Sequence, residues 1–352
     1  MTRQDQKVSA GGQAIQAHGD VNINQGITPE QMLIIMEGVS SQIQKGEDRA
    51  AALVERRLRE FEQSTLGEFA KPGGAADPEA FREPDFQFAL RQAQSAYVRS
   101  GDDGLKDELI KLLAMRSGEK IRSRKALILN EAIQVVGNLT TEEISALVAL
   151  FLFNNVHINE ARDLGHVASV LNDCLSPFID DFPTEDFSFD YLESMRCVTI
   201  NQISHSDVWN ILVQRYGNVF TKGFSNSDFV TALSAKSDVN RSELVQVNSM
   251  DFTGKIRFKP KNREDLTEVL SRIDPSNLVT QAVTDLWESS KMSDAEMKKV
   301  VEQKMPNVFK LASLWENSPA KSSNITGLGK VIAHSALTSR AGFSAPLEIW
   351  AK

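Results

Sequence analysis

The chain has few of the residues on which the commonest metal sites and disulfide scaffolds depend. Its 352 residues include two cysteines, Cys174 and Cys197, and five histidines. Two cysteines are too few for a disulfide framework, and they fit a reducing cytoplasm. No histidine stands in a ligand spacing such as His-Glu-x-x-His, and neither cysteine has a second one nearby. The sequence therefore predicts no metal site and no cofactor.

Long hydrophobic runs and an excess of positive charge are missing as well. The longest apolar run, residues 146–153, is far too short to span a bilayer. No cationic, hydrophobic leader opens the chain. The formal net charge of −8 argues against a nucleic-acid binder that uses its whole surface. We therefore expect a cytoplasmic protein without a membrane partner.

A segment of alternating polarity near the start is the most informative feature that is present. Odd positions from 15 to 23 read Ile, Ala, Gly, Val and Ile, and the even positions between them are polar. A period of two predicts a strand with one apolar face. Because a lone strand is not stable in water, it has to pair, and a second copy of the chain is the partner we expect. The residues predicted to make this contact are Ile15, Ala17, Val21 and Ile23.

A long helix is predicted to follow this strand. Thr28-Pro29-Glu30-Gln31 has the form of a capping box, with proline at the first helical position. Apolar residues then recur at spacings of three and four as far as Phe61. The residues of this stripe that we assign to oligomerisation are Met32, Ile35, Met36 and Val39. Residues 1–65 are thus predicted to form one module of strand plus helix that joins copies of the chain.

The remainder divides by composition into four parts, and the fold class predicted is mainly α with a smaller α+β part. Residues 66–84, rich in glycine, proline and alanine, are predicted as a flexible linker. A helical bundle is expected over 85–180, an α+β region over 181–317 and a C-terminal tail element over 318–352. Strands are predicted at 197–202, at 243–248 and as a pair around residues 251–258, and Pro306 is expected to kink or divide the helix over 293–315.

Several motifs resemble those of an uncharacterised family of soluble bacterial proteins. The matching residues are Ile15 to Ile23, Gly26 to Thr28, the Pro-Asp-Phe-Gln-Phe-Ala-Leu run at 84–90, and the tail motifs at 326–333 and 347–350. The resemblance implies no activity and no catalytic residues. Leaders with Gly-Asp-Val-Asn-Ile also resemble those of proteins linked to bacterial conflict and phage defence, which implies a defence role by analogy.

Two basic stretches are the candidate nucleic-acid contacts. Residues 255–263 alternate charge with Ile256 and Phe258, so a strand would place Lys255, Arg257 and Lys259 on one face. The candidate residues are Lys255, Arg257, Lys259, Lys261 and Arg263. The simpler interpretation is an edge strand protected from aggregation by lysines, and it is favoured here. Residues 120–125 are predicted to be the surface of a helix.

Gly327-Leu-Gly-Lys330 invites comparison with a phosphate-binding loop. That loop needs a glycine five residues before the second glycine and a hydroxyl residue after the lysine, and this chain has Asn324 and Val331 instead. A turn that leads into a helix is therefore predicted.

The function expected from these features is that of a cytoplasmic homo-oligomeric interaction protein, a sensor or scaffold in bacterial antiphage defence. Two alternatives stay open. The first is an enzyme whose site is assembled from distant residues, although no motif identifies catalytic residues. The second is a nucleic-acid-binding protein that uses residues 255–263.

Overall fold

The structure is a computed structural model of the 352-residue chain. It describes residues 29–71, 76–158, 161, 163–201, 203, 205–235, 239–246 and 254–350, with side chains from residue 49 onward and without that of residue 246. The chain divides into two compact units, Met1–Arg56 and Arg57–Lys352. The predicted strand at 15–23 lies outside the described residues.

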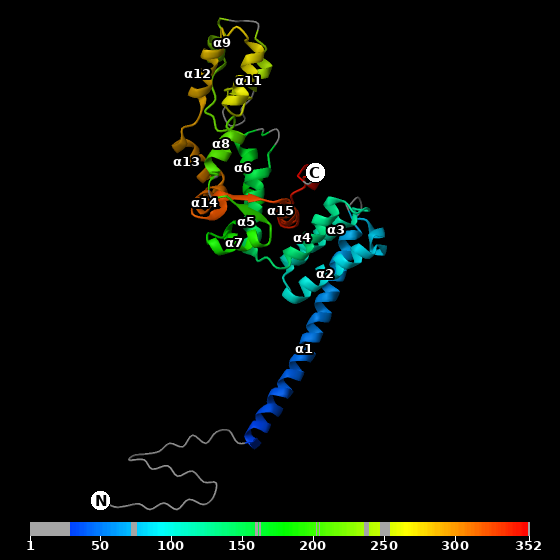
Figure 1. Cartoon of the computed structure of the whole chain (residues 1–352). Helices are drawn as coiled ribbons and strands as arrows, with labels where there is room; N and C mark the ends of the chain where they lie inside the picture. The colour runs from blue at the N-terminus through cyan, green and yellow to red at the C-terminus, as the bar shows by residue number, and fades with distance from the viewer. Residues whose placement is uncertain are drawn as a thin grey trace, which may run out of the picture. The chain divides into compact units, whose positions relative to one another are not determined.

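Helices dominate the described residues, so the prediction of a mainly α fold with a small β component is confirmed (Figure 1). The α-helices are α1 (Pro29–Phe69), α2 (Pro84–Ser100), α3 (Asp103–Ser117), α4 (Arg124–Val136), α5 (Thr141–Asn155), α6 (Leu164–Leu175), α7 (Asp186–Ser194), α8 (Val208–Tyr216), α9 (Asn226–Ala232), α10 (Arg241–Leu244), α11 (Arg263–Ile273), α12 (Thr280–Ser290), α13 (Asp294–Lys304), α14 (Pro306–Glu316) and α15 (Gly327–Arg340). Four 3-10 turns are η1 (Pro78–Arg82), η2 (Ile179–Asp181), η3 (Pro319–Ser322) and η4 (Leu347–Ile349). The strands form two antiparallel pairs, β1 (Val198–Ile200) with β4 (Ser323–Ile325) and β2 (Val245–Gln246) with β3 (Arg257–Phe258).

Helix starts follow the capping residues that the sequence contains. The backbone N–H of Thr140 donates to the Glu143 carboxylate over 2.8 Å at the start of α5, and Ser293 does the same to Glu296 over 2.8 Å at the start of α13. Of the two effects predicted for Pro306, a kink or a division, the structure shows the division, because α13 ends at Lys304 and Pro306 begins α14.

A large core holds most of the second unit together. It joins the end of α1 and helices α2–α8 to α13–α15, and α5 is buried on all sides. Helix α15 packs against α3, α4 and α5, although the whole region 181–317 separates it from them in sequence. Its start approaches β1 so closely that a Cβ on Gly329 would lie 2.2 Å from the Cys197 carbonyl oxygen. Only glycine fits there, which accounts for Gly329 of the 327–330 motif without a phosphate.

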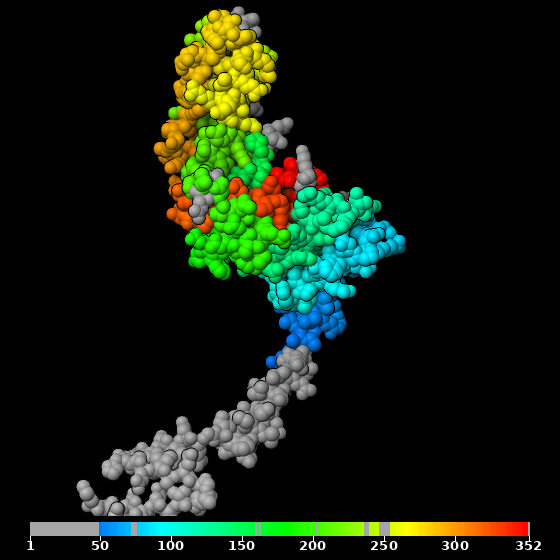
Figure 2. Space-filling view, in the orientation of Figure 1, coloured from blue at the N-terminus to red at the C-terminus, as the bar shows by residue number. Residues whose placement is uncertain are grey.

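A small core forms separately from residues that follow one another in sequence. Its buried residues are Phe224, Phe229, Leu233, Val239, Leu244, Val245, Phe258, Leu266, Leu270, Val279, Val283 and Trp287. Figures 1 and 2 show its main helices, α9, α11 and α12, gathered beside one another in green to orange. The two ends of the segment lie side by side. Thr221 and Lys291 form an antiparallel bridge, and Lys222 N–H donates to the Ser290 carbonyl over 2.7 Å.

Two local predictions differ from the structure. The predicted helix of residues 29–65 continues to Phe69, where Phe69 packs edge-to-face against Phe81 of η1 and Phe86 of α2. The strand pair predicted within 251–258 is not the pairing found in the described residues. There, β3 pairs with β2, and the connection between these two strands is longer than the predicted two-residue turn. Ile256 also forms a bridge with Phe224. Tertiary contacts decide which strands pair, and these contacts cannot be read from a turn motif of two residues.

Candidate functional site

Two cavities lie beside the loop that joins α3 to α4. This loop contains residues 118–123, and with the first residues of α4 it carries the basic run 120–125. The prediction of a helix surface for that run is therefore wrong, since α4 begins only at Arg124 with Ser123 as its N-cap. We call the two hollows the Arg116 cavity, of about 530 Å³, and the His334 cavity, of about 540 Å³. Both lie within the size range of small-molecule pockets.

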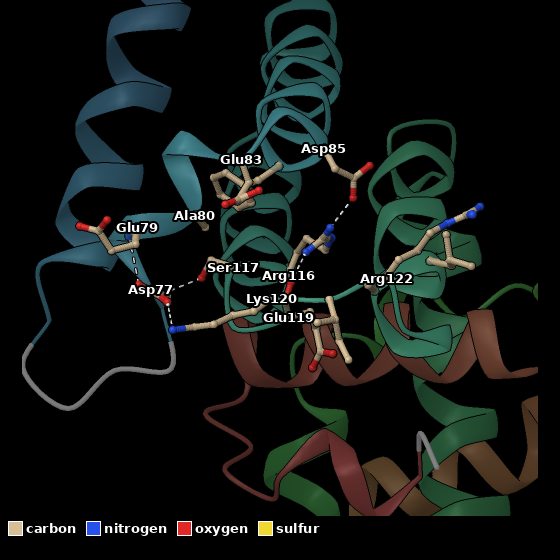
Figure 3. A pocket seen from close by; sticks show the side chains of 14 residues that line it. Asp77, Glu79, Ala80, Glu83, Asp85, Arg116, Ser117, Glu119, Lys120 and Arg122 are labelled. Atoms are coloured by element: carbon tan, nitrogen blue, oxygen red, sulfur yellow. Dashed lines mark hydrogen bonds and ion pairs between the residues drawn. The ribbon is translucent and has the colours of Figure 1, made fainter.

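Several of the charged side chains that line the Arg116 cavity pair with one another (Figure 3). The buried Arg116 guanidinium binds the Asp85 carboxylate, the Asn130 side-chain oxygen at 2.8 Å and the Glu119 carbonyl at 2.8 Å. Hydrogen bonds from Asn130 and Arg116 lower the pKa of Asp85. Lys120 lies 3.1 Å from the Asp77 carboxylate. Because Arg116 and Lys120 are paired with Asp85 and Asp77, these contacts fix the loop to α2 and η1.

The apolar part of the Arg116 cavity is partly open to solvent. Ile121 is 76% exposed and Leu127 is 46% exposed, and both line the cavity together with the buried Phe86. Isolated exposed apolar residues are common on soluble proteins. They give this cavity no chemistry of its own.

The His334 cavity is assembled from six segments. Its lining comes from the end of α1, from α3, from the loop after α3, from the start of α4, from α15 and from the strap that follows α15, which we define as residues 342–348. The charged lining residues are Glu68, Lys111, Glu119, Lys125 and Glu348, and the apolar ones include Met115, Phe343 and Leu347. A mostly apolar wall with a few convergent polar groups is typical of ligand pockets.

His334 is buried in this wall with a defined tautomer. Its ring packs among Phe151, Phe343 and Trp350, with centroid distances of 6.4, 5.8 and 5.9 Å. Nε2 lies 2.7 Å from the Ala345 carbonyl oxygen, so Nε2 carries the hydrogen and donates it. Burial lowers the pKa of His334 below its ordinary value, which keeps the ring neutral at pH 7. Nδ1 is then an acceptor, and no described residue donates to it.

Two lysines stand at the edge of the cavity, each held by carboxylates. Lys111 lies 2.6 Å from Glu68, and Lys125 lies 2.8 Å from Glu119 and 2.5 Å from Glu348. Burial alone would lower the pKa of Lys125, but its hydrogen bonds to Glu119 and Glu348 outweigh that effect and raise it. Lys125 is therefore charged at pH 7 and is held between two carboxylates.

The predicted oligomerisation residues fall in the first unit. Ile15, Ala17, Val21 and Ile23 lie outside the described residues. The helix prediction holds for Met32, Ile35, Met36 and Val39, which lie within α1. The structure describes the backbone of these residues and not their side chains. Their assignment to an interface between copies stays a prediction.

The predicted basic face at 255–263 is not formed as expected. Arg257 is 1% exposed, and its Nη2 donates to the Ala161 carbonyl over 2.9 Å. Lys255 and Lys259 are exposed and donate to the carbonyls of Lys222 and Ser242, at 3.1 and 2.6 Å. Because Arg257 faces inward, the three residues do not share one exposed face, and nucleic-acid binding through them stays an untested prediction.

The last two candidates of this stretch also differ in position. Lys261 lies 2.6 Å from His157 Nε2 and contributes to a neutral, stacked pair of His157 and Tyr216. Burial, and then the charge of Lys261, lower the pKa of His157. Arg263 is the exposed first residue of α11. A phosphate backbone would therefore meet scattered cations here, not a continuous stripe.

The two cysteines serve packing, and His205 lies 3.0 Å from the Ser322 hydroxyl through its Nδ1. Cys174 and Cys197 are free and buried, and burial raises their pKa to about 11 and about 12. Both thiols are therefore protonated and unreactive at pH 7. Across the described residues no three His, Cys, Asp or Glu side chains are grouped as a metal site would require.

Sequence reasoning had only a weak local signal for the His334 cavity. Its lysines, glutamates and histidine lie far apart in the chain, and none belongs to a motif with a fixed spacing. The one local hint was the basic run 120–125, which contains Lys125. Only the packing of α15 and its strap against α3 and α4 brings these residues together.

Comparison with known proteins gives a family and no function. Neither the curated proteins nor the solved structures contain a match to this chain. No helix of the described residues combines the length and apolarity needed to cross a membrane. The model of one family, of uncharacterised function, matches residues 26–351 and so includes α1, both cores and both cavities. The chain belongs to this uncharacterised family.

Proposed function

We propose that the protein is a homo-oligomeric interaction protein that assembles through the first unit, by α1 and the segment before it. The observation that carries the proposal is the division of α1 between the two units at Arg56 and Arg57. Within the second unit, Phe61 is fully buried and Phe69 is 8% exposed. Before the boundary, residues 49–52 are exposed and Val54 is 41% exposed.

The first part of α1 needs a partner for physical reasons. Helices gain most of their stability from packing an apolar face, and little from helix propensity alone. The sequence gives this part an apolar stripe that includes Met32, Ile35, Met36 and Val39. It also contains Gly38 and Gly46, each of which costs about 1 kcal/mol relative to alanine. Packing against the same helix of a second copy would offset that cost.

The family match supports a central role for the helix. The matched range begins at residue 26 and contains the whole of α1, whereas residues 15–23 precede it. We therefore assign the main interface to α1 and a supporting one to the alternating segment.

The test compares the stripe with the opposite face of the same helix. Val39→Asp places a charge on the stripe, and Ser41→Asp places the same charge about 160° away around the helix. We expect Val39→Asp to weaken self-association more than about tenfold, because an unpaired charge is costly to bury. Ser41→Asp should leave it unchanged. Light scattering over a concentration series measures the mass. A monomeric wild-type chain at every concentration would contradict the proposal.

A role as a sensor or scaffold in bacterial antiphage defence, in the cytoplasm, is the biological part of the proposal. It is supported by the Gly-Asp-Val-Asn-Ile residues at 19–23 and their resemblance to leaders of conflict proteins. The same pair of variants tests it. If the wild-type protein and Ser41→Asp reduce phage plaque formation and Val39→Asp does not, assembly and defence are linked. Equal plaque numbers with and without the wild-type protein would refute the defence role.

A further inference from the structure

Several contacts between the small core and the large core come from one short connection, residues 259–262, which joins β3 to α11. We call this connection the docking loop. The Asn218 side chain, just after α8, donates to the Lys259 carbonyl over 3.0 Å, and the Asn262 side chain donates to the Gln214 carbonyl over 3.4 Å. The buried apolar residues of the two cores form separate clusters. The docking loop therefore holds the cores together by polar contacts, with little apolar burial.

The centre of the docking loop brings two basic side chains together. Lys261 Nζ lies 2.6 Å from Nε2 of His157, which follows α5 of the large core. An ammonium group only donates, so Nε2 accepts and the ring carries its hydrogen on Nδ1. The ring also stacks on Tyr216, at a centroid distance of 5.6 Å and an interplanar angle of 6°. The backbones are close as well, since a Cβ on Gly217 would lie 2.3 Å from the Lys261 carbonyl oxygen. This arrangement requires the neutral form of His157.

The charged groups around His157 oppose a proton on its ring. Lys261 faces the ring from the docking loop, Arg215 faces it from α8, and Asp265 of α11 is the carboxylate that acts on it. Arg215 is held beside the ring, because its Nη1 donates to the Val156 carbonyl over 2.6 Å. Burial, and then the charges of Lys261 and Arg215, lower the pKa of His157 below its ordinary value of 6.5, and Asp265 acts in the opposite direction. A proton on Nε2 would also replace the acceptor by a second donor.

We propose that His157 and Lys261 form an acid-sensitive latch between the two cores. At neutral pH the ring accepts from Lys261, and the docking loop is closed on α8. When the ring binds a proton, its Nε2–H and the Lys261 ammonium repel each other, and the docking loop leaves the large core. The small core then turns about its two ends, which the Thr221–Lys291 bridge holds together. The latch lies within the second unit and is independent of assembly through α1.

The direction of the pH effect follows from linkage. The pKa of His157 is lowered while the docking loop is closed, and it returns toward 6.5 when Lys261 leaves. Closure is therefore complete above pH 6.5 and weakens as pH falls below that value. At pH 5.5, one unit below the ordinary pKa of 6.5, a single proton raises the ratio of open to closed chains by about tenfold at most. Asp274 of the small core stays ionised there, because its pKa lies below 3.8.

Single-molecule fluorescence energy transfer on the full chain measures this ratio. One dye is attached at Ser169→Cys on α6 and the other at Glu268→Cys on α11; both positions are exposed, and the native thiols are buried. We expect the ratio of open to closed chains to rise about three- to tenfold between pH 7.5 and pH 5.5. A ratio that does not change between these two pH values would overturn the proposal.

Three variants connect the change to the latch. His157→Gln supplies an amide oxygen that accepts from Lys261 and does not titrate, so its ratio should be the same at both pH values. Lys261→Met removes the repelling charge and should make the response to pH smaller. His205→Gln, at an exposed position of the large core, is the control and should respond as the wild-type protein does. Circular dichroism at both pH values establishes that each variant is folded. A full response in His157→Gln or Lys261→Met, or a lost response in His205→Gln, would assign the change to other groups and overturn the latch.

Discussion

The two cores of the second unit are built from the same kinds of residue but from different arrangements of the chain. The large core joins helices α2–α8 to α13–α15, and so it depends on contacts between residues more than a hundred positions apart. The small core uses only residues between Phe224 and Trp287, and its ends meet at the Thr221–Lys291 bridge. The comparison indicates that the small core is an insertion, which can open without unfolding the large one.

The cores also bury carboxylates in opposite ways. Glu108 of α3 is fully buried in the large core, with Arg340 of α15 at 2.6 Å but not aligned as a hydrogen bond. Burial outweighs the arginine and raises the pKa of Glu108 to about 7. Burial would likewise raise the pKa of Asp274 in the small core, but hydrogen bonds from Val279, Thr280 and Leu278 outweigh it and lower that pKa. A rise in pH therefore weakens the large core, whereas acid weakens the small one.

The largest expected effect is that of Trp315→Ala in the large core. The Trp315 ring is fully buried, and its Nε1–H donates to the Ser206 carbonyl over 3.0 Å. We expect the substitution to lower the free energy of unfolding by about 3–5 kcal/mol, through lost burial and a cavity. Chemical denaturation followed by circular dichroism measures this loss for the whole unit.

The matched variant is Phe258→Ala in the small core. Phe258 is 3% exposed and packs against Phe224 at 4.5 Å and Phe229 at 6.1 Å. Hydrogen exchange should show faster exchange for amides of residues 224–287 alone, with α5 and α15 still protected. Faster exchange throughout both cores would break the distinction between them.

The next prediction concerns the pH dependence of the stability of the large core. The folded pKa of Glu108, about 7, lies above its ordinary value of 4.5, so the folded protein holds the proton more strongly. Its contribution to stability is complete below pH 4.5 and is lost as pH rises through 7. The loss should amount to roughly 3 kcal/mol. Glu108→Gln should remove this slope, as measured by denaturation at pH 5 and pH 8. Glu79→Gln, at an exposed position, should keep the wild-type slope.

The smallest expected effect on the large core is that of removing the small core. Lys222 N–H donates to the Ser290 carbonyl, so an Asn-Gly turn in place of residues 223–289 suits the gap. The shortened chain should keep the free energy of unfolding of the large core within about 2 kcal/mol, because chain ends that already meet need little extra closure. Denaturation of the shortened chain measures this, and a chain that does not fold would refute the insertion.

Local features of the fold could be predicted from the sequence because their causes are local. Pro29, Pro306 and the Thr140 and Ser293 caps place helix starts at the residues where the structure has them. The apolar run at 146–153 gives a helix buried on all sides. Strand partners were harder to predict, because the pairing of β2 with β3 depends on the small core as a whole.

The candidate site could not be predicted, because its residues lie far apart in the sequence and only the fold brings them together. Lys125 and Glu348 are separated by 223 positions and meet at 2.5 Å. Arg257, placed on an exposed face by its period-two pattern, is buried because the chain of the large core offers the Ala161 carbonyl to it. Alternation in the sequence shows which residues share a face of a strand, and the elements packed against the strand decide which face is buried.

The position of α15 at the end of the described chain has a consequence for synthesis on the ribosome. Helices α3, α4 and α5 leave the ribosome well before the helix that packs against all three of them. At about 5–20 residues per second, the apolar surface of α5 waits roughly 10–40 s for its last neighbour. During that interval the nascent chain exposes the surface that chaperones recognise, whereas the small core has all of its own residues once Trp287 has been synthesised. Production of this protein is therefore expected to depend on chaperones more than its native stability suggests.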